Sequence, residues 1–160
     1  MTTVRADPRT QYEALLDVKY AALLNKMQCR FFARMRGTFT VIFLVAGSAT
    51  FAGWVAKIPQ LTGVCALIVA VLSALDVVLD LGKKSAQCDE LARRFNDLGR
   101  ESTGLGLEEI DRRISFLREY PSHEIEALRP IAFNRNLIEN GRPDDVMPTT
   151  RWQRFVAAIA

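Results

Sequence analysis

Residues 38–56 read TFTVIFLVAGSATFAGWVA, nineteen residues without one charged side chain. A helix of this length extends about 28 Å, close to the ~30 Å hydrocarbon thickness of a bilayer. Residues 61–81, LTGVCALIVAVLSALDVVLDL, form a second apolar run after a short segment that contains Pro59. A soluble helix seldom stays apolar around its whole circumference, so this pattern predicts a transmembrane helical hairpin. The alternative is a hairpin buried inside a soluble helical bundle.

Basic residues flank both predicted spans at the ends away from the connecting segment. They are Lys26, Arg30, Arg34 and Arg36 before the first span and Lys83, Lys84, Arg93 and Arg94 after the second. The connecting segment carries only Lys57. The positive-inside rule therefore places both termini in the cytoplasm. The first residues lack the pattern of a secretory signal peptide, so we expect the first span to serve as an internal anchor.

The remaining sequence predicts an all-α protein with long cytoplasmic helices around the hairpin. We expect an N-terminal tail (1–8), a two-transmembrane helical domain (9–141), a linker (142–149) and a C-terminal amphipathic helix (150–160). Asp7 and Pro8 are typical of a helix start, and the first long helix should then continue to residue 56. A second long helix should run from Gly63 to Leu98, interrupted only by Gly82. Residues 107–120 and a segment from Pro130 to Gly141 should form a small helical cap.

The last predicted helix has an apolar face. Trp152, Phe155, Val156 and Ile159 follow one another at i, i+3, i+4 and i+7, while Arg151 and Arg154 lie elsewhere on the helix. Such a helix can lie on an anionic membrane surface, dock in the groove of a neighbouring subunit, or pack on its own domain. The sequence leaves these three destinations open.

The sequence contains none of the common catalytic or metal-binding patterns. There is no phosphate-binding loop, no GxSxG, no HExxH and no CxxC, and the one histidine, His123, has no Cys or His near it in the sequence. We therefore expect no enzymatic activity, cofactor or metal, and three reduced cysteines. The net charge of +3 is too small to indicate nucleic-acid binding.

Two sets of residues in the spans could carry function. A polar stripe recurs every three or four positions at the end of the second span: Ser73, Asp76, Asp80, and Lys83 or Lys84. Carboxylates in a membrane segment are costly and usually face water or a bundle interior; Asp80 could also pair with a lysine one turn on. Small residues that favour close helix packing are Ala46, Ala49 and Gly53 in the first span and Ala66, Ala70 and Ala74 in the second.

Segments outside the spans also have a distinctive layout. A long helix with Tyr12, Tyr20, Arg30 and Arg34 precedes the hairpin, and a charged helix containing Ala92-Arg93-Arg94-Phe95 follows it. A late segment reads Phe133-Asn134-Arg135-Asn136-Leu137-Ile138. Across residues 9–141 this layout resembles the SLATT family, two-transmembrane effector domains of bacterial nucleotide-signalled defence systems. The resemblance is one of layout, because that family has no catalytic signature, and residues 150–160 have no counterpart that we can place.

The resemblance implies an oligomeric effector of the bacterial inner membrane, which disrupts that membrane in antiphage defence after a separate sensor or signalling protein triggers it. Two spans cannot enclose a pore, so conductance would require a homo-oligomer in the lipid bilayer. The alternatives are a membrane scaffold that recruits a soluble partner without conducting, and a holin-like membrane protein of a phage or plasmid.

Overall fold

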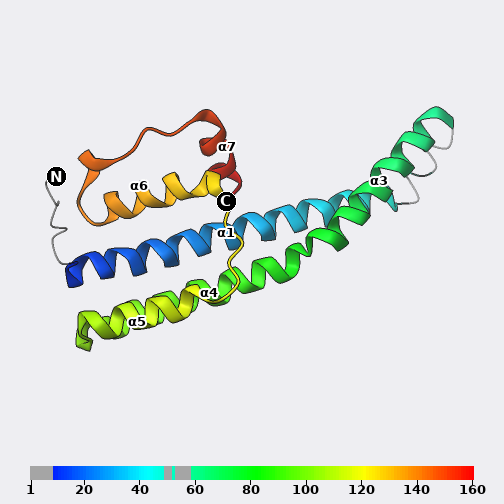
Figure 1. Ribbon diagram of the computed structural model, residues 1–160. Coiled ribbons are helices and arrows are strands. Elements are labelled where there is room, and N and C mark those ends of the chain that lie inside the picture. Colours follow the sequence, from blue (N-terminus) through cyan, green and yellow to red (C-terminus); the bar gives the residue numbers. More distant parts are fainter. Residues whose placement is uncertain (1–8, 49–51, 53–58) are drawn as a thin grey trace, which may run out of the picture.

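The computed structural model describes residues 9–48, 52 and 59–160, and within these residues the chain is helical and has no strand (Figure 1). The α-helices are α1 (Gln11–Ala46), α3 (Pro59–Leu79), α4 (Leu81–Glu101), α5 (Leu107–Arg118), α6 (Arg129–Glu139) and α7 (Arg151–Ile159). Short 3-10 helices cover Ser102–Gly104, Glu126–Leu128 and Pro143–Asp145. The expected all-α fold is confirmed.

Helix α1 begins two residues later than the sequence pattern indicates. Thr10 is its N-cap: the Thr10 hydroxyl accepts a hydrogen bond from the Glu13 amide, and the Glu13 carboxylate accepts one from the Thr10 amide at 2.8 Å. This reciprocal capping box satisfies two amides that would otherwise lack partners. Asp7, the expected cap, lies outside the described residues. The helix continues through Gly37, and of the first predicted span (38–56) the structure describes 38–48 and 52.

The second long helix is divided at Asp80, not at Gly82. Asp80 adopts a left-handed conformation (φ 43°, ψ 52°), which ends α3 and makes Asp80 the N-cap of α4. Aspartate tolerates this conformation better than most residues because its short side chain bonds locally. Here the Asp80 carboxylate accepts a hydrogen bond from the Lys83 amide at 3.4 Å. Gly82 is helical, and a Cβ at that position would lie 2.8 Å from the Arg36 guanidinium. The glycine thus makes room for Arg36.

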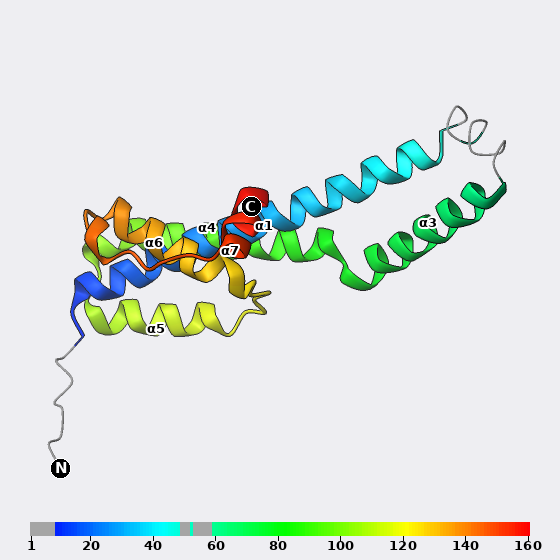
Figure 2. The same ribbon diagram turned by 90° about the horizontal axis from the view of Figure 1, so that it is seen from above.

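Helices α1 and α4 lie side by side and organise the half of the molecule that contains the start of α1 and the C-terminus (Figures 1 and 2). One apolar cluster joins α1, α4 and α5: Ala14, Val18, Ala22, Leu91, Phe95, Leu98, Ile110, Ile114 and Leu117. A second joins α1 to α6 and α7: Leu24, Met27, Leu128, Ala132, Val156 and Ala160. Figure 1 shows α6 and α4 on opposite sides of α1. The α1–α4 half is therefore a helical bundle with its own core.

The other half consists of the end of α1 and the helix α3, which extend away from the bundle (Figures 1 and 2). The stretch Thr62–Gly104 contains a window long and apolar enough to cross a membrane, and only 6% of that window is buried. It is the one such stretch in the part of the chain that the structure describes. The alternative prediction, a hairpin buried inside the chain's own helical bundle, is therefore wrong for α3. A third cluster, Phe32, Phe39, Leu81 and Cys88, marks the boundary between the halves.

Candidate functional site

A mostly apolar groove of about 670 Å³ separates α1 from α3. Ala46 lines it from α1, and Ala66 and Ala70 line it from α3. The small residues of both helices therefore face the same groove, while Ala74 is exposed outside it. Ala49 and Gly53 lie outside the described residues. Small side chains allow close approach of a further helix or an acyl chain, so this groove is a candidate site for assembly within a bilayer.

The predicted polar stripe is distributed over two helices, because α3 ends at Asp80. Ser73 lines the α1–α3 groove, whereas Asp76 is half-buried. Asp80 is exposed and is engaged as a helix cap. Among the described residues no ion pair joins Asp80 to Lys83 or Lys84, so the expected lysine pairing is replaced by the bond to the Lys83 amide.

Asp76 is half-buried because it lies on the side of α3 that faces α1. The half-buried residues of α3 are Cys65, Val69, Leu72, Asp76 and Leu79, which recur at three- and four-residue intervals. This spacing defines one helical face. Leu72 and Leu79 of this face pack on the boundary cluster that contains Phe39 of α1. Asp76 therefore belongs to the face that α3 turns toward α1, within a helix whose other faces are open.

Lys83 lines a shallow surface depression between α4 and the segment after α5, together with Gln87, Arg94 and Tyr120. The Arg94 guanidinium lies 4.6 Å from the centre of the Tyr120 ring. The Arg94 guanidinium also donates to the Glu90 carboxylate at 2.8 Å, and the hydrogen bonds to Glu90 and Tyr120 raise the pKa of Arg94. This contact fixes the end of α5 against α4, and it has a structural role.

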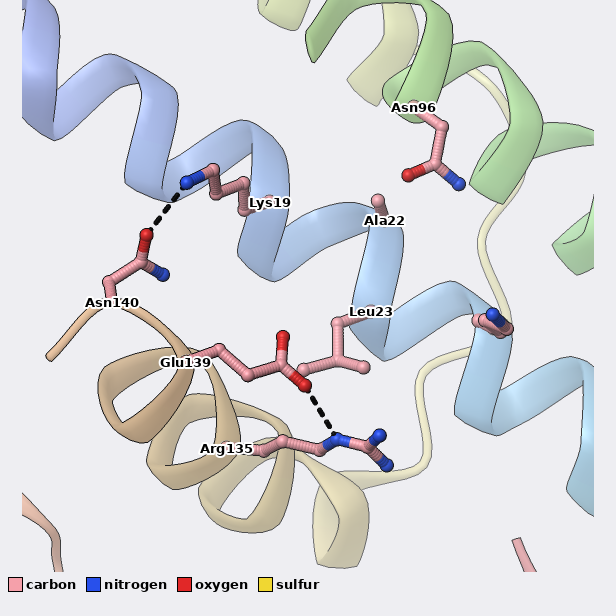
Figure 3. Close-up of a pocket in the computed structure, with 8 residues that line it drawn as sticks. Lys19, Ala22, Leu23, Asn96, Arg135, Glu139 and Asn140 are labelled. Atoms are coloured by element: carbon pink, nitrogen blue, oxygen red, sulfur yellow. Dashed lines mark hydrogen bonds and ion pairs between the residues drawn. The ribbon is translucent and has the colours of Figure 1, made fainter. Parts of the chain in front are cut away.

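A basic pocket lies between α1, α4 and α6 in the bundle half (Figure 3). It has a volume of about 350 Å³ and is lined by Lys19, Ala22, Leu23, Lys26, Asn96, Arg135, Glu139 and Asn140. Figure 3 shows the Lys19 ammonium donating to the Asn140 side-chain oxygen at 2.7 Å and the Arg135 guanidinium paired with Glu139 at 2.9 Å. Three cations face one carboxylate, so the pocket favours an anionic group.

No local pattern in the sequence predicts this basic pocket. Its members come from three helices that are far apart in the sequence, and each of them alone is typical of a solvated helix face. The helical pattern places Lys19 and Lys26 on one side of α1, since seven residues are about two turns. The contribution of Arg135 depends on how α6 packs, and a local pattern contains no information about that packing.

Helix α7 packs on its own domain along one side only. Val156 is buried in the cluster that contains Leu128, whereas Trp152 is 65% exposed and Phe155 is 56% exposed. The Trp152 and Phe155 rings stack with their centres 5.7 Å apart. Ile159 is half-buried. Of the three destinations that the sequence left open, packing on its own domain accounts for Val156 and leaves both aromatic residues without cover.

The cysteines and the histidine have structural surroundings. Cys29, Cys65 and Cys88 are all free thiols, as expected. Burial raises the pKa of the Cys88 thiol to about 11, so this thiol is a poor nucleophile. His123 contacts the Gln87 side-chain oxygen at 3.1 Å and packs edge-on against Phe32. In the described part of the chain no group of three or more His, Cys, Asp or Glu residues could hold a metal ion.

Comparison with known proteins gives no match to a family model, to a curated protein or to a solved structure.

Proposed function

We propose that this chain is an oligomeric effector of the bacterial inner membrane, in which residues 38–56 and 61–81 form a two-span hairpin with both termini in the cytoplasm. Subunits associate in the bilayer and form a pore or a lesion when the cytoplasmic helices receive a signal from a partner or ligand. The observation that carries the proposal is the exposure of apolar side chains on the sides of α3 turned away from α1, beside a bundle that buries its own apolar residues.

The exposed apolar side chains of α3 lie on the sides of the helix that are turned away from α1. They are Val64, Leu67, Ile68, Val71, Leu75, Val77 and Val78 on α3, with Val41, Leu44 and Val45 on α1. Patches of this size on a soluble protein indicate a partner or a membrane. A helix apolar on all sides suits lipid, which contacts all sides equally. The cations Arg36, Lys83 and Lys84 stand where α1 and α4 leave this apolar region, which supports the cytoplasmic orientation of the bundle.

Assembly follows from the cost of the intramembrane carboxylate. Asp76 lies about one turn beyond Asp80 into the predicted span, and among the described residues it has no ion-pair partner. A carboxylate at such a depth is stabilised by water or by a polar group of another helix. Two spans cannot supply an aqueous path, whereas a ring of subunits can. The α1–α3 groove with Ala46, Ala66 and Ala70 offers a surface for their contact.

The trigger would reach the protein through the bundle half. The basic pocket with Lys19, Lys26 and Arg135 suits an anionic ligand, and α1 connects the pocket directly to the membrane half. The defence role itself comes from the resemblance to SLATT domains. A scaffold that does not conduct is the second candidate, favoured by the uncovered aromatic pair on α7, which could receive a soluble protein.

Inducible expression in bacteria with a membrane-potential dye tests the proposal. Wild-type protein should depolarise the cells. Asp76→Asn should change the rate of depolarisation several-fold, because it removes the charge of the carboxylate that would face the water of the proposed pore. The matched control is Asp97→Asn, the same substitution at an exposed carboxylate of α4, which pairs with Arg100 at 3.6 Å. The control should behave like wild type. Abundant wild-type protein in the membrane with an intact potential would favour the scaffold.

A further inference from the structure

Helix α7 lies across α1 rather than along it. In Figure 1 it descends onto α1 from the side, and in Figure 2, turned by 90°, it is seen nearly along its own axis. The Arg34 guanidinium fixes its end by donating to the carbonyls of Ala158 at 3.3 Å and Ile159 at 2.9 Å. Arg34 precedes Thr38, where the first predicted span begins, by four residues or about 6 Å along the helix axis.

This position makes α7 parallel to the plane that a membrane would occupy. If α1 enters the bilayer at Thr38, the membrane surface crosses α1 close to Arg34, and a helix transverse to α1 at that level lies along the surface. The bundle clusters around Ala14 and Ile110 lie farther from the span, toward the start of α1. Among the described helices, α7 is thus the transverse element at the membrane end of the bundle.

The apolar arc of α7 is wider than the arc that the bundle covers. Val156 and Ala160 face the bundle and are buried. At 100° per residue, Trp152, Phe155 and Ile159 occupy one flank of Val156. On this flank Ile159 is half-buried and the two aromatic side chains remain exposed. The stacked indole and phenyl rings combine a large apolar surface with the one polar N–H of tryptophan, which is the chemistry enriched at membrane–water interfaces.

The charges of α7 match a phospholipid surface as well. Arg151 and Arg154 are exposed on the side away from the buried face, and α7 contains no acidic residue. Arginine next to interfacial aromatic residues can bind lipid phosphates while the rings enter the acyl boundary. A soluble protein partner would use the same rings, yet it would not explain why α7 is transverse and tied to Arg34.

We propose that α7 is an interfacial membrane helix, which inserts Trp152 and Phe155 into the headgroup region of the same bilayer that the hairpin crosses. This inference rests on the proposed membrane placement of residues 38–56 and 61–81. It assigns α7 the role of fixing the bundle against the membrane surface, so that a movement of the bundle must carry α7 out of the interface or along it.

The two tryptophans of the chain make the inference separately testable. Trp54→Phe leaves Trp152 as the only reporter on α7, and Trp152→Phe leaves Trp54 as the only reporter on the first span. Each full-length variant is reconstituted in vesicles of phosphatidylglycerol and phosphatidylcholine, with and without bromine on the upper acyl chain. Bromine quenches only indoles that it can touch. Circular dichroism checks that both variants keep the helical content of wild type.

We expect bromine to remove about half or more of the Trp152 emission, because an interfacial helix lies about 5–10 Å into the headgroup boundary. Quenching of Trp54 without quenching of Trp152 overturns the inference and leaves the membrane hairpin intact. A blue-shifted Trp152 emission that bromine does not quench also overturns it, since protein then covers the ring. Absence of quenching in both variants overturns the membrane placement itself.

Discussion

The two ends of α1 differ in what surrounds them. The first end packs against α4, α5, α6 and α7, and its buried residues extend from Ala14 to Phe39. In residues 40–46 no side chain is buried, although the sequence there is more apolar. The partners differ in the same way: α4 buries six residues, whereas none of the side chains described for α3 is buried. The more apolar half is thus the less buried half.

The proposed membrane placement accounts for this inversion, because it puts the two halves in different solvents. In water, uncovered apolar surface costs about 25 cal/mol per Å², so an amphipathic helix must find a partner. In lipid that cost vanishes, and helices can stay apart until packing or polar groups join them. The α1–α4 half has the first kind of sequence and the α1–α3 half has the second. The bundle should therefore fold by its own contacts, and the hairpin should depend on its surroundings.

The largest expected effect on stability comes from replacing one isoleucine by alanine in each half. Ile110 of α5 is fully buried, and Ile68 of α3 is 51% exposed. Ile110→Ala should lower the free energy of unfolding by about 2–5 kcal/mol, because it leaves a cavity in the core. Ile68→Ala should change it by less than about 0.5 kcal/mol, since about half of this side chain is already exposed and its loss leaves no enclosed cavity. Urea titration in detergent micelles, followed by circular dichroism, measures both.

Equal losses from the two alanine variants would contradict the comparison. That result would mean that α3 is packed against protein as tightly as α5, for example within a preformed oligomer. Repeating the Ile68→Ala titration at several protein concentrations separates the two cases, because only an oligomer contact makes the loss depend on concentration.

A smaller effect is expected at Asp80, where the halves meet. Asp80→Ala replaces a cap and a residue tolerant of positive φ, so the kinked form should lose about 1–2 kcal/mol relative to a continuous helix. Spin labels at the exposed positions Leu67 and Arg93 should then move apart as α3 and α4 straighten. Asp80→Asn is the control, because asparagine keeps both the cap and the tolerance. An unchanged label distance in Asp80→Ala would show that packing, not Asp80, sets the kink.

Much of the fold follows from local patterns in the sequence. Within the described residues, the lack of strands and the helices α5 and α6 close to residues 107–120 and 130–141 agree with prediction, because each depends on a few neighbouring residues. Two predicted helix boundaries, the start of α1 and the break between α3 and α4, were wrong because a local side-chain hydrogen bond decides each of them. Thr10 is the cap of α1 because Glu13 completes its capping box, and Asp80 breaks a helix that the apolar pattern continues through.

The candidate sites were less predictable because they depend on packing between distant segments. The spacing of Ser73, Asp76 and Asp80 predicts a single stripe, yet the kink at Asp80 separates its members from the lysines of α4. The basic pocket joins Lys26 to Arg135 across more than a hundred residues. For α7 the sequence predicted the apolar face, but only the docking of Val156 shows which part of that face remains open.

A further contrast compares one thiol from each half. Cys88 is buried in the boundary cluster, with a pKa raised from an ordinary 9.0 to about 11, whereas Cys65 lines the α1–α3 groove. At pH 8 the folded Cys88 thiolate should therefore be about 100-fold scarcer than in the unfolded chain, and alkylation by iodoacetamide should slow accordingly. Mass spectrometry of the Cys29→Ser variant, which keeps both thiols, measures this rate for each cysteine peptide.

The same raised pKa fixes the sign of the pH effect. Because the folded state favours the neutral thiol, Cys88 stabilises the fold fully below pH 9 and loses this contribution as the pH rises toward about 11. Cys88→Ala should remove that part of the alkaline loss of stability.

The thiol in the other half supplies the contrast. Denaturant that unfolds the bundle should speed the alkylation of Cys88, while the alkylation of Cys65 should stay slow as long as lipid covers it. If the alkylation of both thiols accelerated at the same denaturant concentration, bundle and hairpin would unfold as one unit. The kink at Asp80 would then divide the helices without dividing the protein into separately unfolding parts.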